Sequence, residues 1–213
     1  MAHFANDPMM IASFQKGEDI HRRTAAEVYG VDINDVTPAQ RRKAKTANFA
    51  IIYGVSAYGL AQQSELSFTE SKDFIQVYFE RYPGIKSYMD RSIEFARNNG
   101  FVSTMFNRRR YLPDISAKSV QARQFAERIA INMPIQGTAA DMIKIAMIHI
   151  AQRMRGMKSK MILQVHDELV FDVYTGELEK LKNIVKTEME YAVELKVPIK
   201  VDLAIGNNWL EAK

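Results

Sequence analysis

The sequence predicts an α+β fold, with a helix-rich first half followed by a small antiparallel sheet backed by helices. Helical apolar spacing and helix end signals dominate the first half. Over residues 160–205 the order becomes hairpin, helix and strand, which is typical of a small, largely antiparallel sheet. With 213 residues, 47% of them hydrophobic, the chain is also long enough to bury a core.

Helices are expected where apolar residues recur at helical spacing between end signals. The clearest start is TPAQ at residues 37–40, where threonine is the N-cap, proline occupies the first helical position and glutamine the third. Thr138, with Asp141 three residues later, gives a second start signal. The predicted helices span residues 19–29, 37–53, 69–80, 84–98, 118–132, 138–154 and 177–196.

Strands are expected where apolar and polar residues alternate between turn signals. The sequence IKVDLAI at residues 199–205 shows this alternation most clearly and predicts one buried and one wetter face. The predicted strands span residues 101–105, 109–112, 160–166, 168–173 and 199–205.

The composition excludes several classes of site. The absence of cysteine rules out disulfides, thiolate zinc sites and cysteine nucleophiles. No apolar run reaches the roughly 18 residues that span a bilayer, and MAHFANDPMM lacks the pattern of a signal peptide, so a soluble intracellular protein is expected. Because the net charge is only +4, an anionic partner would be recognised by local basic clusters, which lie at residues 41–45 and 108–110.

A stripe of cationic and aromatic side chains follows the helix that begins at Thr37. Arg41, Lys45 and Phe49 are four residues apart, and Tyr53 continues the series with a drift of roughly 40° per step. Arg41 and Phe49 are about 12 Å apart along the axis, which is roughly the length of a nucleoside triphosphate. Cations in the first turns oppose the helix dipole, and a bound anion would reverse that penalty. The alternative is a solvated basic face with both aromatic rings in the core.

A second polar stripe interrupts the apolar segment ERIAINMPIQGTAAD. Arg128, Asn132 and Gln136 are again four residues apart. Such side chains can donate to the base acceptors that all base pairs display in the minor groove, which senses the shape of a pair without its identity. The alternatives are an internal hydrogen-bond ladder and a cap for the helix near Thr138.

Three titratable residues, His166, Asp167 and Glu168, lie at the tip of the predicted hairpin LQVHDELVFDV. Adjacent strand residues point to opposite faces, so both carboxylates can face one ligand only if the turn distorts the alternation. A carboxylate there suits Mg²⁺, which typically binds one or two protein carboxylates together with substrate phosphates. The alternative is an ordinary polar hairpin tip.

Taken together, these segments resemble the polymerase domain of the family A DNA polymerases, the DNA polymerase I family of bacteria. RRKAKTANFAIIYG (41–54) is similar to the family's fingers-helix motif, and LQVHDELVF (163–171) is similar to the carboxylate hairpin of its palm. DIHRRTAAEVYG, YFERYPG, RRRYLPDI and INMPIQGTAADMIK also match, in the expected order. The resemblance implies helix-rich fingers over residues 1–120, with 1–12 from the junction with the palm, and the C-terminal part of the palm over 121–213.

The resemblance also implies the role of each residue in the first stripe. Arg41 and Lys45 would hold the incoming triphosphate, with His21 reaching the same phosphates. Phe49 would pack against sugar and base, and phenylalanine there is associated with rejecting dideoxynucleotides. Tyr53 would check the nascent base pair.

In the same way, the resemblance implies DNA and metal ligands. The implied catalytic set is Asp167, Glu168 and Lys45, with Asp167 as the metal ligand. The DNA-contacting residues would be Arg128, Asn132, Gln136, Gln164 and His166. The reaction would be attack of a primer 3′ hydroxyl on the α-phosphate of a dNTP, with two Mg²⁺ ions. The expected partners are primer-template DNA, dNTPs and the upstream part of the polymerase chain, in a bacterial cytoplasm at the nucleoid and without a membrane.

The sequence departs from the family pattern in three places. Ala50 and Asn107 stand where the family commonly has glycine, and both are tolerable because alanine suits a helix and asparagine accepts left-handed turns. No aspartate has the context Asp-Tyr-Ser-Gln-Ile-Glu-Leu-Arg of the family's other catalytic aspartate. We therefore expect a fragment, without thumb or nuclease domains, that is inactive alone. The alternatives are non-catalytic binding of nucleotide or primer-template and, less compatible with the residue spacing, a metal-dependent phosphohydrolase.

Overall fold

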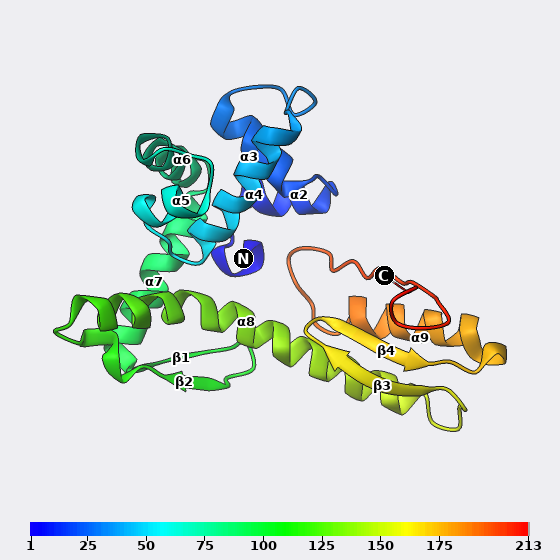
Figure 1. Ribbon diagram of the computed structural model, residues 1–213. Helices are drawn as coiled ribbons and strands as arrows, with labels where there is room; N and C mark the ends of the chain where they lie inside the picture. The colour runs from blue at the N-terminus through cyan, green and yellow to red at the C-terminus, as the bar shows by residue number, and fades with distance from the viewer. Residues whose placement is uncertain (213) are drawn as a thin grey trace. The chain divides into compact units, whose positions relative to one another are not determined.

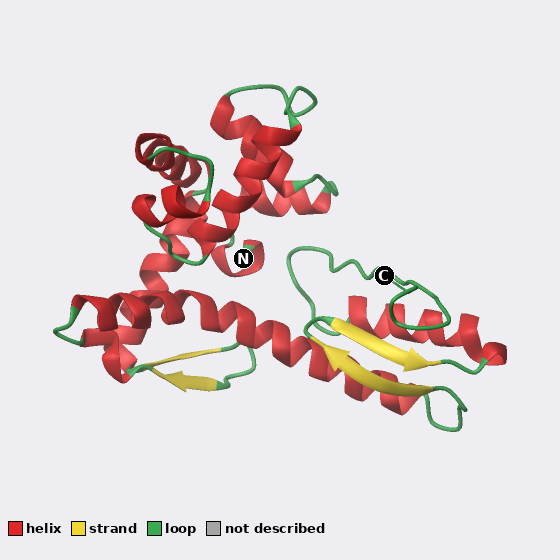
Figure 2. Ribbon diagram, viewed as in Figure 1, coloured by secondary structure: helices red, strands yellow, loops and turns green. Residues whose placement is uncertain are grey.

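The computed structural model describes residues 1–212, and the chain divides into two compact units, Met1–Gly137 and Thr138–Lys213 (Figure 1). The division falls inside the long helix α8 (Val120–Arg153). The subdomain boundary expected after residue 120 stays a prediction. Helices dominate the first unit, and the second contains a β-hairpin (Figure 2).

Five helices of the first unit, α2 to α6, begin where a side chain accepts a backbone N–H group. Asp7, Asp19, Thr37, Ser56 and Ser67 each accept a hydrogen bond from a backbone N–H in the first turn that follows. Preceding α8, the helices are α1 (Ala2–Ala5), α2 (Pro8–Gln15), α3 (Ile20–Tyr29), α4 (Pro38–Ile52), α5 (Ala57–Gln63), α6 (Phe68–Arg81) and α7 (Pro83–Asn99). α1, α2 and α5 were not predicted, and all three are shorter than three full turns.

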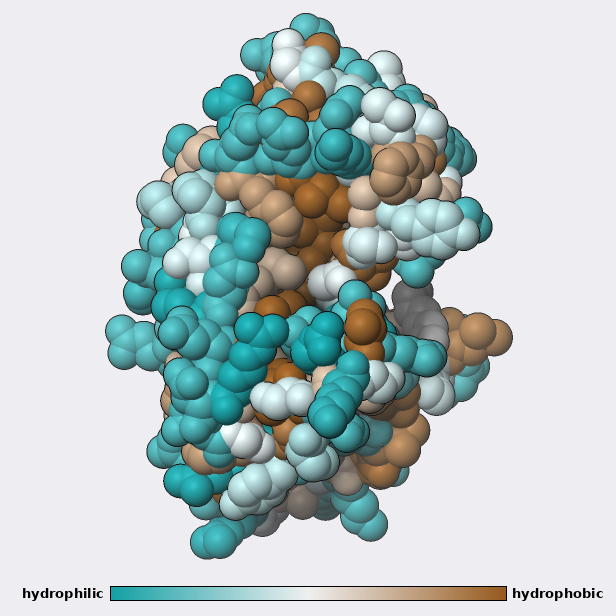
Figure 3. Space-filling model, turned by 90° about the vertical axis from the view of Figure 1, so that its left-hand side faces the viewer, coloured by the Kyte–Doolittle hydropathy of each residue, from teal (hydrophilic) through white to brown (hydrophobic). Residues whose placement is uncertain are grey.

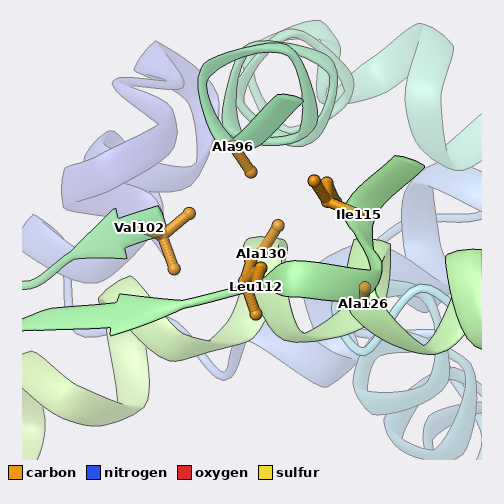
Figure 4. Close-up of a cluster of buried hydrophobic side chains, with 6 residues drawn as sticks. All are labelled: Ala96, Val102, Leu112, Ile115, Ala126 and Ala130. Carbon is orange, nitrogen blue, oxygen red and sulfur yellow. The ribbon is translucent and has the colours of Figure 1, made fainter. Parts of the chain in front are cut away.

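A small apolar cluster joins α7, a short hairpin and the start of α8 (Figure 4). The hairpin pairs β1 (Phe101–Ser103) with β2 (Arg109–Tyr111) in antiparallel register, and the short 3-10 helix η1 (Pro113–Ser116) follows. The buried members of the cluster are Ala96, Val102, Leu112, Ile115, Ala126 and Ala130. This packing fixes the first part of α8 against the hairpin.

The predicted break between residues 132 and 138 is wrong, because α8 continues through Pro134. A proline inside a helix costs about 3 kcal/mol through the lost N–H bond and the steric clash. Apolar side chains are buried before the proline, at Ala130 and Ile131, and beyond it in the second unit, at Ala146 and Ile150. Burial on both sides therefore outweighs the local penalty.

The second unit contains the hairpin of β3 (Lys160–Val165) and β4 (Glu168–Asp172), followed by the short 3-10 helix η2 (Thr175–Glu177) and α9 (Leu178–Glu190) (Figure 1). Its core consists of Ala146, Ile150, Met154, Leu181, Ile184 and Val185. Glu177 fastens the open end of the hairpin, since its carboxylate accepts from the backbone N–H groups of Lys158 at 3.0 Å and Ser159 at 2.9 Å. These bonds lower the pKa of Glu177.

The strand predicted at residues 199–205 is not formed in the described part of the chain, and α9 ends six residues before the predicted end at 196. Apolar alternation makes a strand only when a neighbouring strand accepts its hydrogen bonds. Here the backbone N–H of Val201 donates to the Glu190 carboxylate, and Ile205 stays exposed.

The α+β class is confirmed. Within residues 1–212, no helix is both long and apolar enough to cross a membrane. Large apolar and aromatic side chains remain at the surface of the first unit, including Phe49, Tyr53, Tyr58 and Phe68. Figure 3 shows apolar residues between polar ones on one face of the molecule.

Candidate nucleotide and primer-template site

The helix that carries the cationic stripe begins as predicted from its capping box. The Thr37 hydroxyl accepts from the backbone N–H of Gln40 at 3.2 Å, and the Gln40 side chain accepts from the N–H of Thr37 at 2.9 Å. α4 packs against α3, and both helices bury small residues, with Ala25 and Ala44 fully buried. The two helix axes can therefore approach closely.

Arg41 is held by a carboxylate that the sequence did not single out. Its Nε donates to Asp19 Oδ2 at 2.7 Å. Asp19 is the N-cap of α3, and it also accepts from the backbone N–H groups of His21 at 2.9 Å and Arg22 at 3.1 Å. Burial opposes ionisation of Asp19, but the bonds from Arg41 and Arg22 outweigh it and lower its pKa. The aspartate therefore orients a cation at the start of the stripe.

His21 lies between the cations and the first aromatic ring of the stripe. Its Nδ1 is 3.0 Å from the amide nitrogen of Asn48, and its ring lies 5.6 Å from that of Phe49 at 46°. Burial lowers the pKa of His21, the positive charges of Arg41 and Lys45 lower it further, and Asp19 opposes them. The imidazole is therefore biased toward its neutral form.

The aromatic members of the stripe are at the surface, as are its cations. Phe49 is 49% exposed and Tyr53 43%, which excludes the alternative that both rings lie in the core. Lys45 is exposed and Arg41 half-buried. Of the two explanations drawn from spacing, an accessible cationic and aromatic surface is the one that the structure forms.

The first and second stripes meet in the first unit. Gln136 Nε2 donates to the Tyr53 hydroxyl at 3.2 Å. Gly54, next in the chain, has φ of 73°, and a Cβ there would lie 3.3 Å from Cγ of Arg128 and 3.5 Å from Ile131. The absence of a side chain thus lets the end of α4 approach α8. The hydrogen bond to Tyr53 is internal to the first unit, so the alternative of an internal hydrogen-bond ladder stays open for Gln136.

The second stripe lies on one continuous helix. Gln136 is exposed, whereas Arg128 and Asn132 are half-buried. The Arg128 guanidinium lies 5.8 Å from the centre of the Phe125 ring. Since α8 is unbroken, Gln136 is not a cap for a new helix, and the three side chains keep the i, i+4, i+8 spacing of one face.

The predicted carboxylate hairpin forms in the second unit with a two-residue turn. Val165 pairs with Glu168, which leaves His166 and Asp167 as the turn residues. His166 has φ of 53°, so a positive φ at the first turn position matches a type II′ turn. Gln164 Nε2 donates to the backbone oxygen of His166 at 2.6 Å.

The donor set at this tip fits the chemistry of a hard divalent cation. Asp167 and Glu168 are exposed, adjacent and offer only oxygen atoms, the type of ligand that Mg²⁺ prefers. Among residues 1–212, no group of three or more histidine, aspartate and glutamate side chains could hold a metal. Asp167 and Glu168 would therefore supply only part of a cation's ligands.

Comparison with known proteins establishes the family. The family model described as "DNA polymerase family A" matches residues 1–211. The chain belongs to the family A DNA polymerases. The family resemblance inferred from the motifs is thereby confirmed, whereas the role of each residue stays a prediction.

Relatives in the family match this chain along its whole length. It is 52% identical over 215 residues to DNA polymerase I of Caldicellulosiruptor bescii, and 50% identical over 216 residues to DNA polymerase I of Lactococcus lactis subsp. lactis. Each alignment covers 100% of this chain and 25% of the relative, so the chain spans about a quarter of their length.

A solved structure described as "POL domain of Pol1 from M. smegmatis complex with DNA primer-template and dNTP" has the same fold. It matches with a TM-score of 0.94 and 43% sequence identity, covering 99% of this chain and 38% of that one.

Sequence reasoning missed Asp19, Thr24 and Asn48. The only local signal was Asp19 at an N-cap position ahead of the helix IHRRTAAEVY. Asn48 lies within the fingers-helix motif but makes its contacts with residues 24 and 27 positions away. Such contacts are set by the α3 and α4 packing, which spacing along one helix does not reveal.

Proposed function

We propose that this chain is the nucleotide- and primer-template-binding part of a polymerase that performs template-directed DNA synthesis. The main support is the hydrogen bond between Tyr53 and Gln136. It joins the first stripe, on α4, to the second stripe, on α8, within one unit. The likeness to the M. smegmatis polymerase, whose description includes primer-template and dNTP, supports this assignment.

The triphosphate would bind along α3 and α4. Arg41 and Lys45 offer positive charge, and charge-assisted hydrogen bonds to phosphate are about twice as strong as neutral ones. His21 adds an imidazole donor beside them, and Phe49 offers an exposed ring to the sugar and base. Tyr53 then lies at the end of the stripe, where Gln136 holds its hydroxyl.

Primer-template would contact α8 and the hairpin tip. Arg128, Asn132 and Gln136 follow one helix face with donors suited to the acceptors common to every base pair. Gln164 and His166 would approach the primer end, and the bond between them holds the turn in shape. This arrangement reads pair geometry rather than base identity, as a template-directed enzyme requires.

Asp167 and Glu168 would hold Mg²⁺ for nucleotidyl transfer, with Asp167 as the first ligand. Mg²⁺ bound there would supply activation of the primer 3′ hydroxyl and stabilisation of the leaving oxygen of the triphosphate, as in a two-metal mechanism. The exposure of both carboxylates keeps them accessible to ions and phosphates. Lys45 would neutralise charge on the leaving phosphates.

We also propose that the chain is inactive alone. No aspartate in it has the Asp-Tyr-Ser context of the family's other catalytic carboxylate. The rest of a bacterial polymerase, in the cytoplasm at the nucleoid, would supply that ligand. The alternative function, binding of nucleotide or primer-template without catalysis, would then apply to the separate chain. It would not apply to the whole enzyme.

The test compares the separate chain with a chimaera in which it replaces the matching segment of the C. bescii enzyme. The chain alone should bind a fluorescent dNTP weakly and in a salt-sensitive manner, without extending a primer in Mg²⁺. The chimaera should extend it. Extension by the chain alone would contradict the proposed dependence on an upstream carboxylate, and a folded but inactive chimaera would contradict the proposed function.

A further inference from the structure

A chain of polar groups runs from the backbone of α3 through α4 to the ring of His21. The Thr24 hydroxyl donates to the backbone oxygen of Ile20 at 2.8 Å. The Asn48 amide nitrogen lies 3.1 Å from the Thr24 hydroxyl oxygen and 3.0 Å from His21 Nδ1. Thr24 is fully buried and Asn48 is 4% exposed, so water does not compete for these bonds.

The direction of each proton follows from the first bond. A carbonyl oxygen only accepts, so the single proton of the Thr24 hydroxyl is committed to Ile20. The Thr24 oxygen must then accept from Asn48, which means that the NH₂ end of the amide faces it. The second proton of that NH₂ group points to the imidazole, and Nδ1 must accept it. A neutral imidazole that accepts at Nδ1 carries its proton on Nε2.

We propose that Asn48 is a positioning residue that holds His21 as the neutral tautomer protonated on Nε2, ready to donate one hydrogen bond to a phosphate of the incoming nucleotide. The tautomer rests on the four groups described above. Its use toward phosphate rests on the proposed function.

The cost of this arrangement supports a functional rather than a packing role. Asn48 Oδ1 is buried and, within residues 1–212, has no hydrogen-bond partner. An unsatisfied buried acceptor costs about 1–3 kcal/mol. An apolar side chain would avoid that cost, but it would leave Nδ1 without a donor and the tautomer undetermined.

The charged neighbours of His21 favour the same state. Arg41 and Lys45 oppose a positive charge on the ring, and Asp19 favours it. Burial is the largest influence, and the pKa of His21 is lowered overall. An imidazolium would also direct an Nδ1–H at the NH₂ group of Asn48, which places donor against donor.

The direct test is the ¹⁵N spectrum of the imidazole nitrogens in the 213-residue chain, with His21 assigned through His21→Gln. We expect Nδ1 of His21 at the chemical shift of an unprotonated nitrogen and Nε2 at that of a protonated one. A protonated Nδ1, or a mixture of both tautomers, would overturn the proposal whether or not any variant folds.

Two variants then test which groups set the tautomer. Asn48→Asp should move the proton to Nδ1, because a carboxylate accepts where the amide donates, and should raise the pKa of His21 in an NMR titration. Thr24→Val should give a mixture of tautomers, because the amide loses the acceptor that orients it, and Thr24→Ser should restore one tautomer.

The matched control is Thr46→Val. Thr46 makes the same type of bond, from its hydroxyl to the backbone oxygen of Arg42. It lies two positions before Asn48 in α4, so its side chain points to a different face of the helix. It should leave the His21 spectrum unchanged. Equal changes in Thr46→Val and Thr24→Val, or an unchanged tautomer in Asn48→Asp, would contradict the role of Asn48.

Titration with a dNTP separates this proposal from the proposed function. If His21 donates to phosphate, the Nε2 resonance should shift on binding while Nδ1 stays unprotonated. If the tautomer is as expected but Nε2 does not respond to the dNTP, the positioning by Asn48 stands and the phosphate contact is wrong.

Discussion

The surface of α3 and α4 carries cations and an imidazole, whereas the hairpin tip carries carboxylates. The two regions differ in whether these groups have partners within the protein. On the helices, the cation and the imidazole already have partners in the same unit, Asp19 for Arg41 and Asn48 for His21. At the tip, the side chains of Asp167 and Glu168 have no hydrogen bond or ion pair within residues 1–212. The first surface is oriented before a ligand arrives, whereas the second offers charge that a ligand must satisfy.

This difference follows from what each surface is proposed to bind. An arginine recognises phosphate through a fixed fork of N–H donors. A partner that holds one edge of the guanidinium therefore also orients the remaining donors toward a phosphate. Carboxylates that bind Mg²⁺ must stay accessible to the ion and its waters. An arginine near the tip would compete with Mg²⁺ for the carboxylates and weaken metal binding.

The largest effect should come from the tip. Asp167→Asn in the C. bescii chimaera should reduce primer extension by at least about 100-fold, because loss of a direct metal ligand exceeds the 10- to 100-fold cost of losing an outer-shell partner. Asp172→Asn, an exposed residue at the other end of β4, is the control. Similar losses in both variants would show that the tip has no special role.

The phosphate surface should respond next, and selectively. Arg41→Ala should weaken binding of a fluorescent dNTP by about 10- to 100-fold, since a hydrogen bond to a charged group contributes about 1.5–3 kcal/mol. Arg42→Ala is the matched control: the side chain is 64% exposed and pairs with Glu65 at 3.4 Å. Equal weakening in the two variants would indicate a general attraction of basic charge rather than an oriented contact.

A smaller effect should distinguish orientation from competition at Arg41. Asp19→Asn keeps an effective N-cap for α3 but removes the charge. The two side chains are 40% and 37% exposed, and ion pairs in contact with solvent contribute about 0–1 kcal/mol. Because the triphosphate no longer meets a carboxylate, its binding should tighten by about two- to fivefold. Weaker binding would mean that orientation by Asp19 outweighs its repulsion of phosphate.

Local chemistry made parts of this fold predictable. The start of α4 follows from four consecutive residues, because a capping box satisfies its own backbone groups. The hairpin and its turn follow from alternation interrupted at residues 166 and 167. The spacing of residues on α4 predicted the stripe, but only the structure showed that it is exposed.

Other features depend on partners far away in sequence. The break expected between residues 132 and 138 does not form, because tertiary packing on both sides outweighs the local cost of Pro134. Residues 199–205 alternate as in a strand, but no neighbouring strand accepts their backbone hydrogen bonds within the described residues. Asp19 and Asn48 both lie in segments that match the family. They were missed because their bonds to Arg41 and His21 cross between helices.

The smallest effect concerns pH and again separates the two regions. Folding lowers the pKa of His21 below its ordinary value of 6.5, chiefly through burial and then through Arg41 and Lys45, against Asp19. Between the folded and the ordinary pKa of His21, the unfolded chain binds more protons at this residue. The contribution of His21 to the free energy of unfolding should therefore be fully present above this window and decrease as pH falls through it. Urea denaturation across that range should show this slope in the wild type and in His166→Gln, at the hairpin tip. The slope should be smaller in His21→Gln, where the Met1 amine, whose pKa burial also lowers, still contributes. Asp19→Asn should extend the slope to lower pH, because it removes the one charge that opposes the shift. A slope of the same size in His21→Gln and in the wild type would assign the pH dependence to another group.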